Sequence, residues 1–297
     1  MLRIIADSTC DISKEDARKM GIQIVPISVR FGNEEFLDGV EITHEEFYTR
    51  LAECDELPKT SQPSPDTFMK VFNEAVAAGD DVLGIFISSD LSGTYQSACL
   101  AALDVEEETG KKPYMVDSRS ASIGTALLIR EAVKLRDAGV NAADIAAACT
   151  EMSKYIKLTA VVGSLKYLKM GGRLSGAAAF AGTMLHITPV VSIEDGKVVV
   201  IGKTRGKKAA EKLMHDKLTE DGLSLTRDFM FGHINCSESL ETFINKSLTY
   251  ISDVNGNVGV SSIGCSVGTH VGPGTYGIAY VEAAESGMNR ASVVKTA

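Results

Sequence analysis

Hydroxyl side chains crowd the segment ISSDLSGTYQSA, residues 87–98, which continues the apolar run DVLGIF. Two kinds of chemistry use such groups. A single serine acts as a nucleophile when a neighbouring base takes its proton. Alternatively, several hydroxyls donate hydrogen bonds to an oxyanion of a ligand, such as a carboxylate or a phosphate. The remaining motifs of the chain bear on this choice.

The nucleophile hypothesis centres on Ser92, with His270, His233 and Asp117 as possible partners of a catalytic triad. The local pattern is not the G-x-S-x-G elbow, because Asp90 stands two residues before Ser92. A triad is defined by geometry, which spacing along the chain does not supply. A hydrolase or acyltransferase that uses Ser92 and His270 therefore stays open as the alternative.

The oxyanion hypothesis rests on several loops together. The loops ADSTCD, SSDLSGT and VDSRSAS each follow a predicted strand, and a fourth loop, KTSQPSP, leads into a predicted helix. Ligands of open parallel sheets bind beyond the carboxyl ends of the strands, so we expect these loops to gather at one edge. Free N–H groups at helix N-termini attract anions there, and Gly93 permits close approach of a ligand to the backbone. This pattern predicts a site for a small oxyanion.

Two further polar residues stand among glycines in the second half of the chain. Arg173 follows a glycine pair in KMGGRLSG, and His270 lies in GTHVGPGTYG. Such glycine-rich segments are typical of fixed loops that present one side chain to a ligand. Arginine binds a carboxylate or phosphate through two parallel hydrogen bonds, and histidine donates or shuttles a proton. The two residues suit acid-group chemistry, although a surface arginine and a histidine satisfied within a turn would show the same pattern.

The first half of the sequence alternates strands and helices. The runs LRIIA, IQIVPISVRF, VLGIFIS and PYMVDS are predicted strands. The helices between them begin with capping signals: Ser13 with Asp16, Thr43 with Glu46, and Ser64 followed by Pro65. This βαβ order predicts an α/β fold, with a Rossmann-like parallel sheet covered by helices on both faces.

The second half predicts a smaller α+β domain with a mixed or antiparallel sheet. A helix capped by Asn141 leads toward a boundary near residue 157, and Asp195-Gly196 between two β-branched runs signals a hairpin. A basic helix and alternating strands and helices follow. The expected domains are residues 1–157 and 158–284, with a frayed tail at 285–297.

Composition excludes several classes of function. The net charge of −9 argues against a general nucleic-acid or anionic-membrane surface. The segment 174–193 lacks acidic and strongly basic residues, but its His186, Pro189, glycines and hydroxyls make it a poor membrane span, and we expect a buried helix that runs into a strand. No Walker loop, no GxGxxG after the first strand and no metal-ligand spacing occur, so no cofactor or metal is expected.

Cysteine usage and the start of the chain bear on location. The six cysteines are scattered with no CxxC pair, which is typical of reduced and mostly buried thiols. The apolar run before Asp7 is shorter than the roughly 7 to 15 residues that a signal peptide needs. We therefore expect a cytoplasmic protein.

Seven motifs in this order resemble the DegV family of bacterial fatty-acid-binding proteins, over about residues 3 to 281. They are DSTCD, FLDGVEI, KTSQPSP, SSDLSGTYQSA, VDSRSASIG, GGRLSG and GTHVGPGTYG. Each motif alone is weak, but the set is specific. The resemblance implies two domains, with a long-chain fatty acid in an apolar tunnel and its carboxylate near the domain junction.

The resemblance also implies roles for individual residues. Thr60 and Ser92, within motifs that include Ser61 and Gly93, would hold the carboxylate, and Arg173, Thr269 and His270 would lie close to the head group or face a partner. In family members studied as the binding subunit of bacterial fatty acid kinase, the protein presents the carboxyl group to a separate ATP-binding kinase subunit, which yields an acyl phosphate. On this basis the chain would be a non-catalytic lipid carrier.

Overall fold

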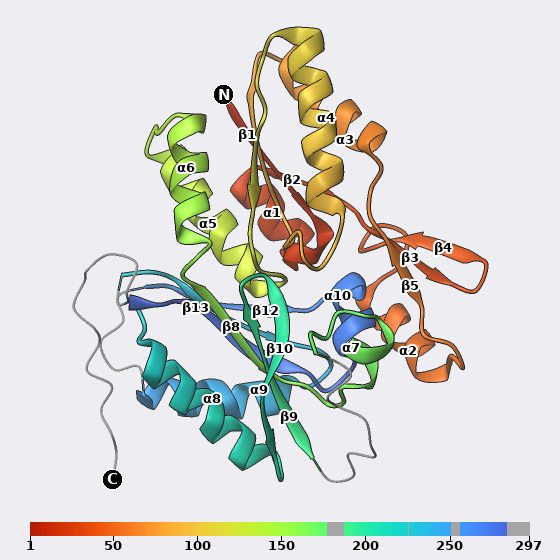
Figure 1. Ribbon diagram of the computed structural model, residues 1–297, viewed down its shortest axis with the longest axis vertical. Coiled ribbons are helices and arrows are strands. Elements are labelled where there is room, and N and C mark those ends of the chain that lie inside the picture. Colours follow the sequence, from red (N-terminus) through yellow and green to blue (C-terminus); the bar gives the residue numbers. More distant parts are fainter. Residues whose placement is uncertain (177–186, 225, 251–255, 284–297) are drawn as a thin grey trace.

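The computed structural model describes residues 1–176, 187–224, 226–250 and 256–283. A parallel sheet with helices on both faces forms the upper part of the molecule, and a mixed sheet forms the lower part (Figure 1). The predicted α/β fold class is confirmed. The boundary at residue 157 stays a prediction. The helix expected near 177–186 and the tail at 285–297 lie outside the described residues.

The first sheet is parallel throughout, with the strand order β2-β1-β6-β7. Its strands are β1 (Leu2–Asp7), β2 (Ile22–Val25), β6 (Asp81–Phe86) and β7 (Tyr114–Asp117). Its helices are α1 (Lys14–Met20), α3 (Pro65–Ala77), α4 (Thr94–Thr109), α5 (Ile123–Asp137) and α6 (Ala142–Met152). Because β1, β6 and β7 are parallel neighbours, the loops that follow them leave the same edge.

Alternation along the strands supplies both faces of this sheet with apolar side chains. Ile4 of β1 packs in a core with residues of α1, α5 and α6, whereas Ile5 packs on the opposite face with residues of α3 and α4. Successive strand residues point to opposite faces, so near-continuous apolar runs such as VLGIF suit a sheet covered twice.

The predicted capping residues take the expected positions. Thr43 and Glu46 form a reciprocal capping box at the start of α2 (His44–Glu53). Ser64 accepts a hydrogen bond from the Thr67 amide, with Pro65 at the first position of α3. These contacts satisfy amides that have no partner within the helix, which explains why the helix starts were predictable from local sequence.

The second sheet is mixed, with the order β10-β9-β8-β13-β11-β12. Its strands are β8 (Ile156–Val161), β9 (Thr188–Glu194), β10 (Lys197–Thr204), β11 (Phe229–His233), β12 (Val258–Ser262) and β13 (Tyr276–Val281). Helices α8 (Lys207–Asp221) and α9 (Ser237–Tyr250) pack on its lower face against a core that includes Phe231 and Tyr276. The β9–β10 hairpin turns at Asp195 and Gly196, as predicted, and both residues have positive φ.

Helix α5 joins the two sheets. Leu128, Ile129 and Ala132 pack into the core of the parallel sheet. Ile123 and Leu127 pack instead into a core with β8, β9 and β13 on the upper face of the mixed sheet. One helix therefore contributes to both cores.

The prediction of one strand across IQIVPISVRF is wrong. The chain breaks at Pro26 into β2 and β3 (Ser28–Phe31), which belong to different sheets. Strand β3 pairs with β4 (Glu34–Leu37) and with β5 (Lys59–Ser61), so the first residues of KTSQPSP form a strand rather than a loop. Proline lacks the amide that a continuing ladder would use, which explains the break.

This three-stranded sheet packs toward the second half of the chain. Val29, Phe47 of α2 and Tyr48 of α2 share a core with Ile263 and Cys265. The short helices η1 (Ser8–Cys10), α7 (Lys166–Met170) and α10 (Cys265–Val271) lie around it. This packing places the residues near position 60 next to those near position 270.

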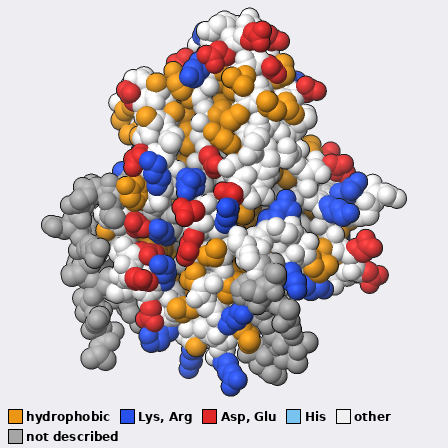
Figure 2. Space-filling view, viewed as in Figure 1, with side chains coloured by type: hydrophobic (Ala, Val, Ile, Leu, Met, Phe, Trp, Pro, Cys, Tyr) orange, Lys and Arg blue, Asp and Glu red, His pale blue; other side chains and the backbone are white. Residues whose placement is uncertain are grey.

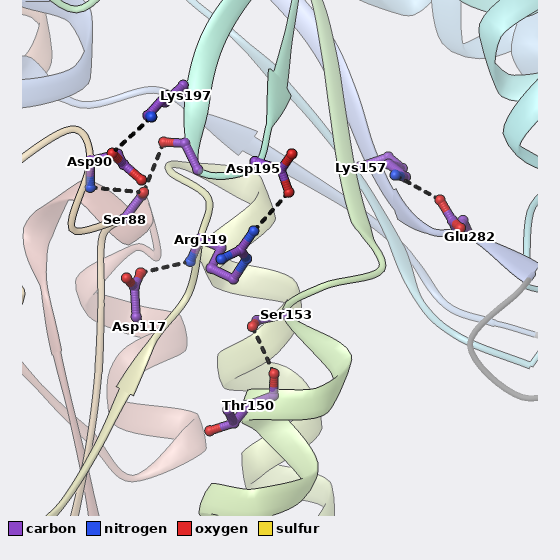
Figure 3. Close-up of polar contacts among 11 residues, drawn as sticks. Ser88, Asp90, Asp117, Arg119, Thr150, Ser153, Lys157, Asp195, Lys197 and Glu282 are labelled. Atoms are coloured by element: carbon purple, nitrogen blue, oxygen red, sulfur yellow. Dashed lines mark hydrogen bonds and ion pairs between the residues drawn. The ribbon is translucent and has the colours of Figure 1, made fainter.

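The turn of the β9–β10 hairpin contacts the loops that follow β6 and β7 (Figure 3). The buried Ser88 hydroxyl donates to the Gly196 carbonyl at 2.8 Å, while Asp90 pairs with Lys197 and Arg119 pairs with Asp195. Figure 2 shows basic and acidic side chains interspersed across the middle of this face of the molecule. Exposed ion pairs contribute little, so the buried Ser88 bond is the stronger element of the contact.

None of the helices in the described ranges combines the length and the apolar character needed to cross a membrane.

The hairpin contact predicts a specific glycine requirement. Gly196 and Gly139 both have φ of +80°, but a Cβ at Gly196 would lie 2.6 Å from Ser88 Oγ, whereas a Cβ at Gly139 meets nothing within 4 Å. Both alanine variants strain the backbone by about 1 to 2 kcal/mol. We expect Gly196→Ala to lose roughly 1 kcal/mol more than Gly139→Ala, because it also breaks the Ser88 hydrogen bond. Thermal unfolding followed by circular dichroism checks this, and equal melting of the two variants would contradict it.

Candidate functional site

A cavity lies between the strand-end loops of the parallel sheet and the upper face of the mixed sheet. It holds about 920 Å³ of space without protein atoms, counting its open mouth, and the centre of a water molecule reaches about 100 Å³ of it. Its apolar lining includes Ile87, Leu91, Ile123, Leu158, Ala160, Val162, Leu168, Val191, Ile193 and Val198. Small-molecule sites in proteins share this mostly apolar character.

All four predicted loops contribute to the lining of this cavity. Thr9 comes from ADSTCD, Thr60 from KTSQPSP, Ser92 from SSDLSGT and Ser122 from VDSRSAS. The expectation that these loops gather at one edge of the sheet is therefore met in the structure.

Four of the residues singled out from the sequence line the cavity and are partly exposed. They are Thr60 at β5, Ser92 just before α4, Arg173 after α7, and His270 on α10. Most of the apolar lining is buried by contrast. These four polar residues are therefore accessible to water, whereas most of the cavity lining is apolar and buried.

His270 lies in the last turn of α10, which corrects the prediction of a glycine-rich loop. Its Nε2 is 2.9 Å from Thr60 Oγ1, and its Nδ1 has no hydrogen-bond partner among the described residues. Burial, with the charge of Arg173 as a smaller cause, lowers the pKa of His270 to about 4. The ring is therefore neutral near pH 7, and it positions the Thr60 hydroxyl without adding charge.

Arg173 lies in the loop after α7, as the sequence predicts. Its Nε donates to the Leu91 carbonyl at 3.1 Å and its Nη1 to the Gly171 carbonyl at 2.6 Å. These bonds fix the guanidinium group beside the Ser92 loop. Of the five N–H donors of an arginine, the other three have no acceptor within the described part of the chain and can meet an anion.

Ser92 and the start of α4 form another donor surface. Ser92 Oγ is 2.9 Å from Thr94 Oγ1 and accepts from the Thr94 amide at 3.3 Å, and the N-cap position of α4 is Gly93, which has no side chain to bond the amides that follow. A helix N-terminus in this state favours an anion. The other hydroxyls of the segment serve the fold, since Ser88 bonds Gly196 and Ser97 bonds Gln62.

Three residues assigned to the site by resemblance do not line the cavity. Ser61 is exposed at the end of β5, and the buried Thr269 hydroxyl donates to the Cys265 carbonyl within α10. A Cβ at Gly93 would lie 2.1 Å from Gln62 Oε1. The close neighbour that Gly93 admits is thus the β5–α3 loop of the protein itself.

The side chains of the hydrolase hypothesis are not joined into a triad. Ser92 bonds Thr94 while His270 bonds Thr60, and the Asp117 carboxylate accepts from the amides of Ser89 and Arg119. His233 is absent from the cavity lining. Among the described residues, Ser92 therefore forms no hydrogen bond with His270, His233 or Asp117.

Sequence reasoning missed four hydroxyls that line the cavity: Thr9, Ser122, Ser266 and Thr275. All of them except Ser266 stand in motifs that were already recognised. Ser266 follows Gly264-Cys265 at the start of α10, and its buried Oγ has no hydrogen-bond partner among the described residues. No local signal distinguishes it from an ordinary helix-start serine.

The model of the DegV family, which is described as an uncharacterised protein family, matches residues 1–283. The chain belongs to the DegV family. A DegV domain-containing protein of Clostridium perfringens is 34% identical over 290 residues, which are 95% of this chain and 98% of the relative.

Solved structures of DegV proteins share this fold. A fatty-acid-binding DegV family protein from Thermus thermophilus superposes with a TM-score of 0.85 at 31% identity, over 94% of this chain and 99% of that one. A stearic-acid-binding protein from Eubacterium ventriosum gives 0.84 at 30% identity, over 95% and 98%. DegV of Bacillus subtilis, a fatty acid binding protein, gives 0.82 at 28% identity, over 95% and 99%.

The lowered pKa of His270 predicts a pH dependence of stability in the ligand-free protein. Between about pH 6.5 and about pH 4 the unfolded chain binds a proton at this ring and the folded chain does not. Acidification through this window therefore destabilises the wild type, and His270→Gln should lose less stability over the same range. Melting temperatures of both proteins at about pH 7 and about pH 5 test this, and parallel losses would refute the assignment.

Proposed function

We propose that this protein binds a long-chain fatty acid, with the acyl chain in the apolar cavity and the carboxylate at Thr60, Ser92 and Arg173. The observation that carries the proposal is one cavity whose lining is mostly apolar and buried but includes partly exposed hydroxyls and a guanidinium group. The fatty-acid-binding proteins among its structural relatives support the same ligand class.

The residues proposed to bind the carboxylate supply hydrogen-bond donors and one positive charge. Thr60 and Ser92 offer hydroxyl protons, and Arg173 offers N–H groups that its two backbone acceptors leave free. Among the cavity-lining residues that the structure describes, Arg173 alone is a lysine or arginine. The neutral His270 orients the Thr60 hydroxyl, so one guanidinium charge faces one carboxylate charge.

The acyl chain and the carboxylate of the ligand contribute different amounts of binding free energy. Burial of about 16 carbons contributes on the order of 10 kcal/mol before the costs of association, at roughly 0.8 kcal/mol per methylene. Each hydrogen bond to a charged group adds only about 1.5 to 3 kcal/mol. The acyl chain therefore supplies most of the affinity, and the polar residues set which end of the ligand faces out.

We further propose that the protein presents the carboxylate to a separate ATP-dependent kinase subunit in the cytoplasm. A carboxylate oxygen would attack the γ-phosphorus of ATP, forming an O–P bond as the bond to the departing ADP breaks, which yields an acyl phosphate. The partial exposure of Thr60, Ser92 and Arg173 supports this, because a carboxylate held there stays within reach of another protein.

Removal of one head-group donor should weaken binding without disturbing the fold. Protein expressed in bacteria should first yield a fatty acid in organic extracts analysed by mass spectrometry. Ser92→Ala should then lower the affinity for a long-chain fatty acid about 10- to 100-fold, because it removes a hydrogen bond to a charged group. Protein that yields no lipid and binds none when fatty acid is added would sink the proposal.

Ser89→Ala is the matched control for this experiment. Ser89 belongs to the same loop and is also partly exposed, but it does not line the cavity. Its substitution should leave both melting temperature and lipid affinity close to those of the wild type. An equal loss of affinity in both variants would mean that the loop as a whole, and not Ser92 Oγ, governs binding.

A larger side chain inside the cavity should shorten the acyl chain that fits. Ala121 is buried and lines the cavity, so Ala121→Phe fills space that the ligand would use. Displacement of three methylenes costs roughly 2.4 kcal/mol, or about 60-fold in affinity for the longest acids. Titration with saturated acids of increasing length measures this, and a uniform loss at every length would place Ala121 away from the acyl chain.

A further inference from the structure

A second cluster of reactive side chains lies at the N-terminal end of α10, beside the head-group end of the cavity. Asp38 follows β4, His44 begins α2 and Cys265 begins α10. One possible ligand atom from each residue lies within 4.8 Å of the corresponding atoms of the other two. Asp38 and Cys265 are buried, and His44 is partly exposed.

We propose that Asp38, His44 and Cys265 form a zinc site. A thiolate, an imidazole and a carboxylate are the three ligand types that zinc takes in proteins, and a sulfur ligand disfavours magnesium and calcium. The cores on either face of the parallel and mixed sheets do not include Asp38, His44 or Cys265, and these residues do not line the proposed fatty-acid site.

The space around Gly264 is lined by side-chain oxygen and nitrogen atoms. A Cβ built at Gly264 would lie 3.1 Å from His44 Nε2, 3.5 Å from Asp38 Oδ1 and 3.1 Å from Asp11 Oδ1. The φ of Gly264 is −78°, so its backbone does not demand glycine. The absence of a side chain instead leaves room among these atoms, and the Asp11 carboxylate is a candidate for a fourth coordination position.

Charge around the cluster also favours a cation. Asp7, Asp11 and Asp38 are all buried, and within the described residues no lysine or arginine pairs with any of them. A bound dication would stabilise the carboxylates of Asp11 and Asp38 and a deprotonated Cys265 thiol.

Helix capping accounts for part of the cluster only. Asp38 accepts hydrogen bonds from the amides of Cys265 at 3.1 Å and Ser266 at 3.0 Å, which satisfies the start of α10. The His44 ring makes no hydrogen bond to any described residue, although its Nε2 faces the space beside Gly264. Capping thus explains Asp38, and packing in the core beside α2 accounts for the burial of Cys265, but neither explains the position of the His44 ring.

The geometry is close to that of a bound site. Tetrahedral zinc with bonds of about 2.0 to 2.3 Å separates its ligand atoms by roughly 3.3 to 3.8 Å, so contraction by about 1 Å completes the site. The metal would join the β4–α2 segment to α10. Since Ser266 and His270 of α10 line the cavity, the proposed zinc would fix the position of the helix that contributes them.

Zinc titration of the metal-free full-length chain tests the proposal. The protein is stripped with a chelator under reducing conditions and titrated with Zn²⁺ against a chromophoric competitor. We expect one zinc per chain, and a loss of more than about 100-fold in affinity for His44→Gln and for Cys265→Ser, since loss of an outer-shell partner alone costs about 10- to 100-fold. Cobalt in place of zinc should give a thiolate-to-metal charge-transfer band that Cys265→Ser abolishes.

Cys54→Ser is the matched control, because Cys54 is another partly buried thiol at the far end of α2 and donates to the Leu51 carbonyl. It should retain the zinc affinity and the cobalt band of the wild type. Circular dichroism of each metal-free variant verifies folding, and His44→Gln, at a partly exposed position, serves if Cys265→Ser does not fold. Binding of less than one zinc, or equal affinity in wild type and His44→Gln, would overturn the proposal whether or not the protein binds lipid.

Discussion

The packing of α5 against both sheets is the interaction on which the rest of the structure depends. Leu128 and Ile129 belong to the core of the parallel sheet, while Ile123 and Leu127 belong to the core of the mixed sheet. A helix that buries side chains in two cores sets the distance and angle between them. The cavity lies beside this helix, bounded by the strand-end loops above and by β8, β9 and β10 below.

The partly exposed polar residues of the cavity come together because this arrangement joins distant parts of the chain. Thr60 and His270 are separated by 210 positions and form a hydrogen bond, and Arg173 is fixed by the carbonyl of Leu91, 82 positions away. Burial keeps the His270 ring neutral, so the guanidinium of Arg173 provides the charge. A fatty acid suits such a site, since it has a single charge at one end and needs an apolar environment for the rest.

The hydroxyl-rich segment after β6 shows which roles of its serines the local sequence could predict. Its composition indicated a polar function, and Ser92 does line the cavity. However, the Ser88 hydroxyl donates a hydrogen bond to Gly196 in the β9–β10 turn, and the Ser97 hydroxyl accepts one from Gln62. Serine at a strand end or helix start satisfies backbone groups as readily as it meets a ligand, and only the positions of its neighbours distinguish the two uses.

The sequence by itself determined the local elements, because their causes are local. Caps such as Thr43 with Glu46, the turn at Asp195-Gly196 and the apolar runs of the parallel sheet act within a few residues. The order of the motifs also indicated the family. Only the tertiary structure decided that Pro26 divides one apolar run between two sheets, that His270 lies on a helix, and that Gly93 meets Gln62. These outcomes depend on contacts between residues far apart in the chain, which no local pattern encodes.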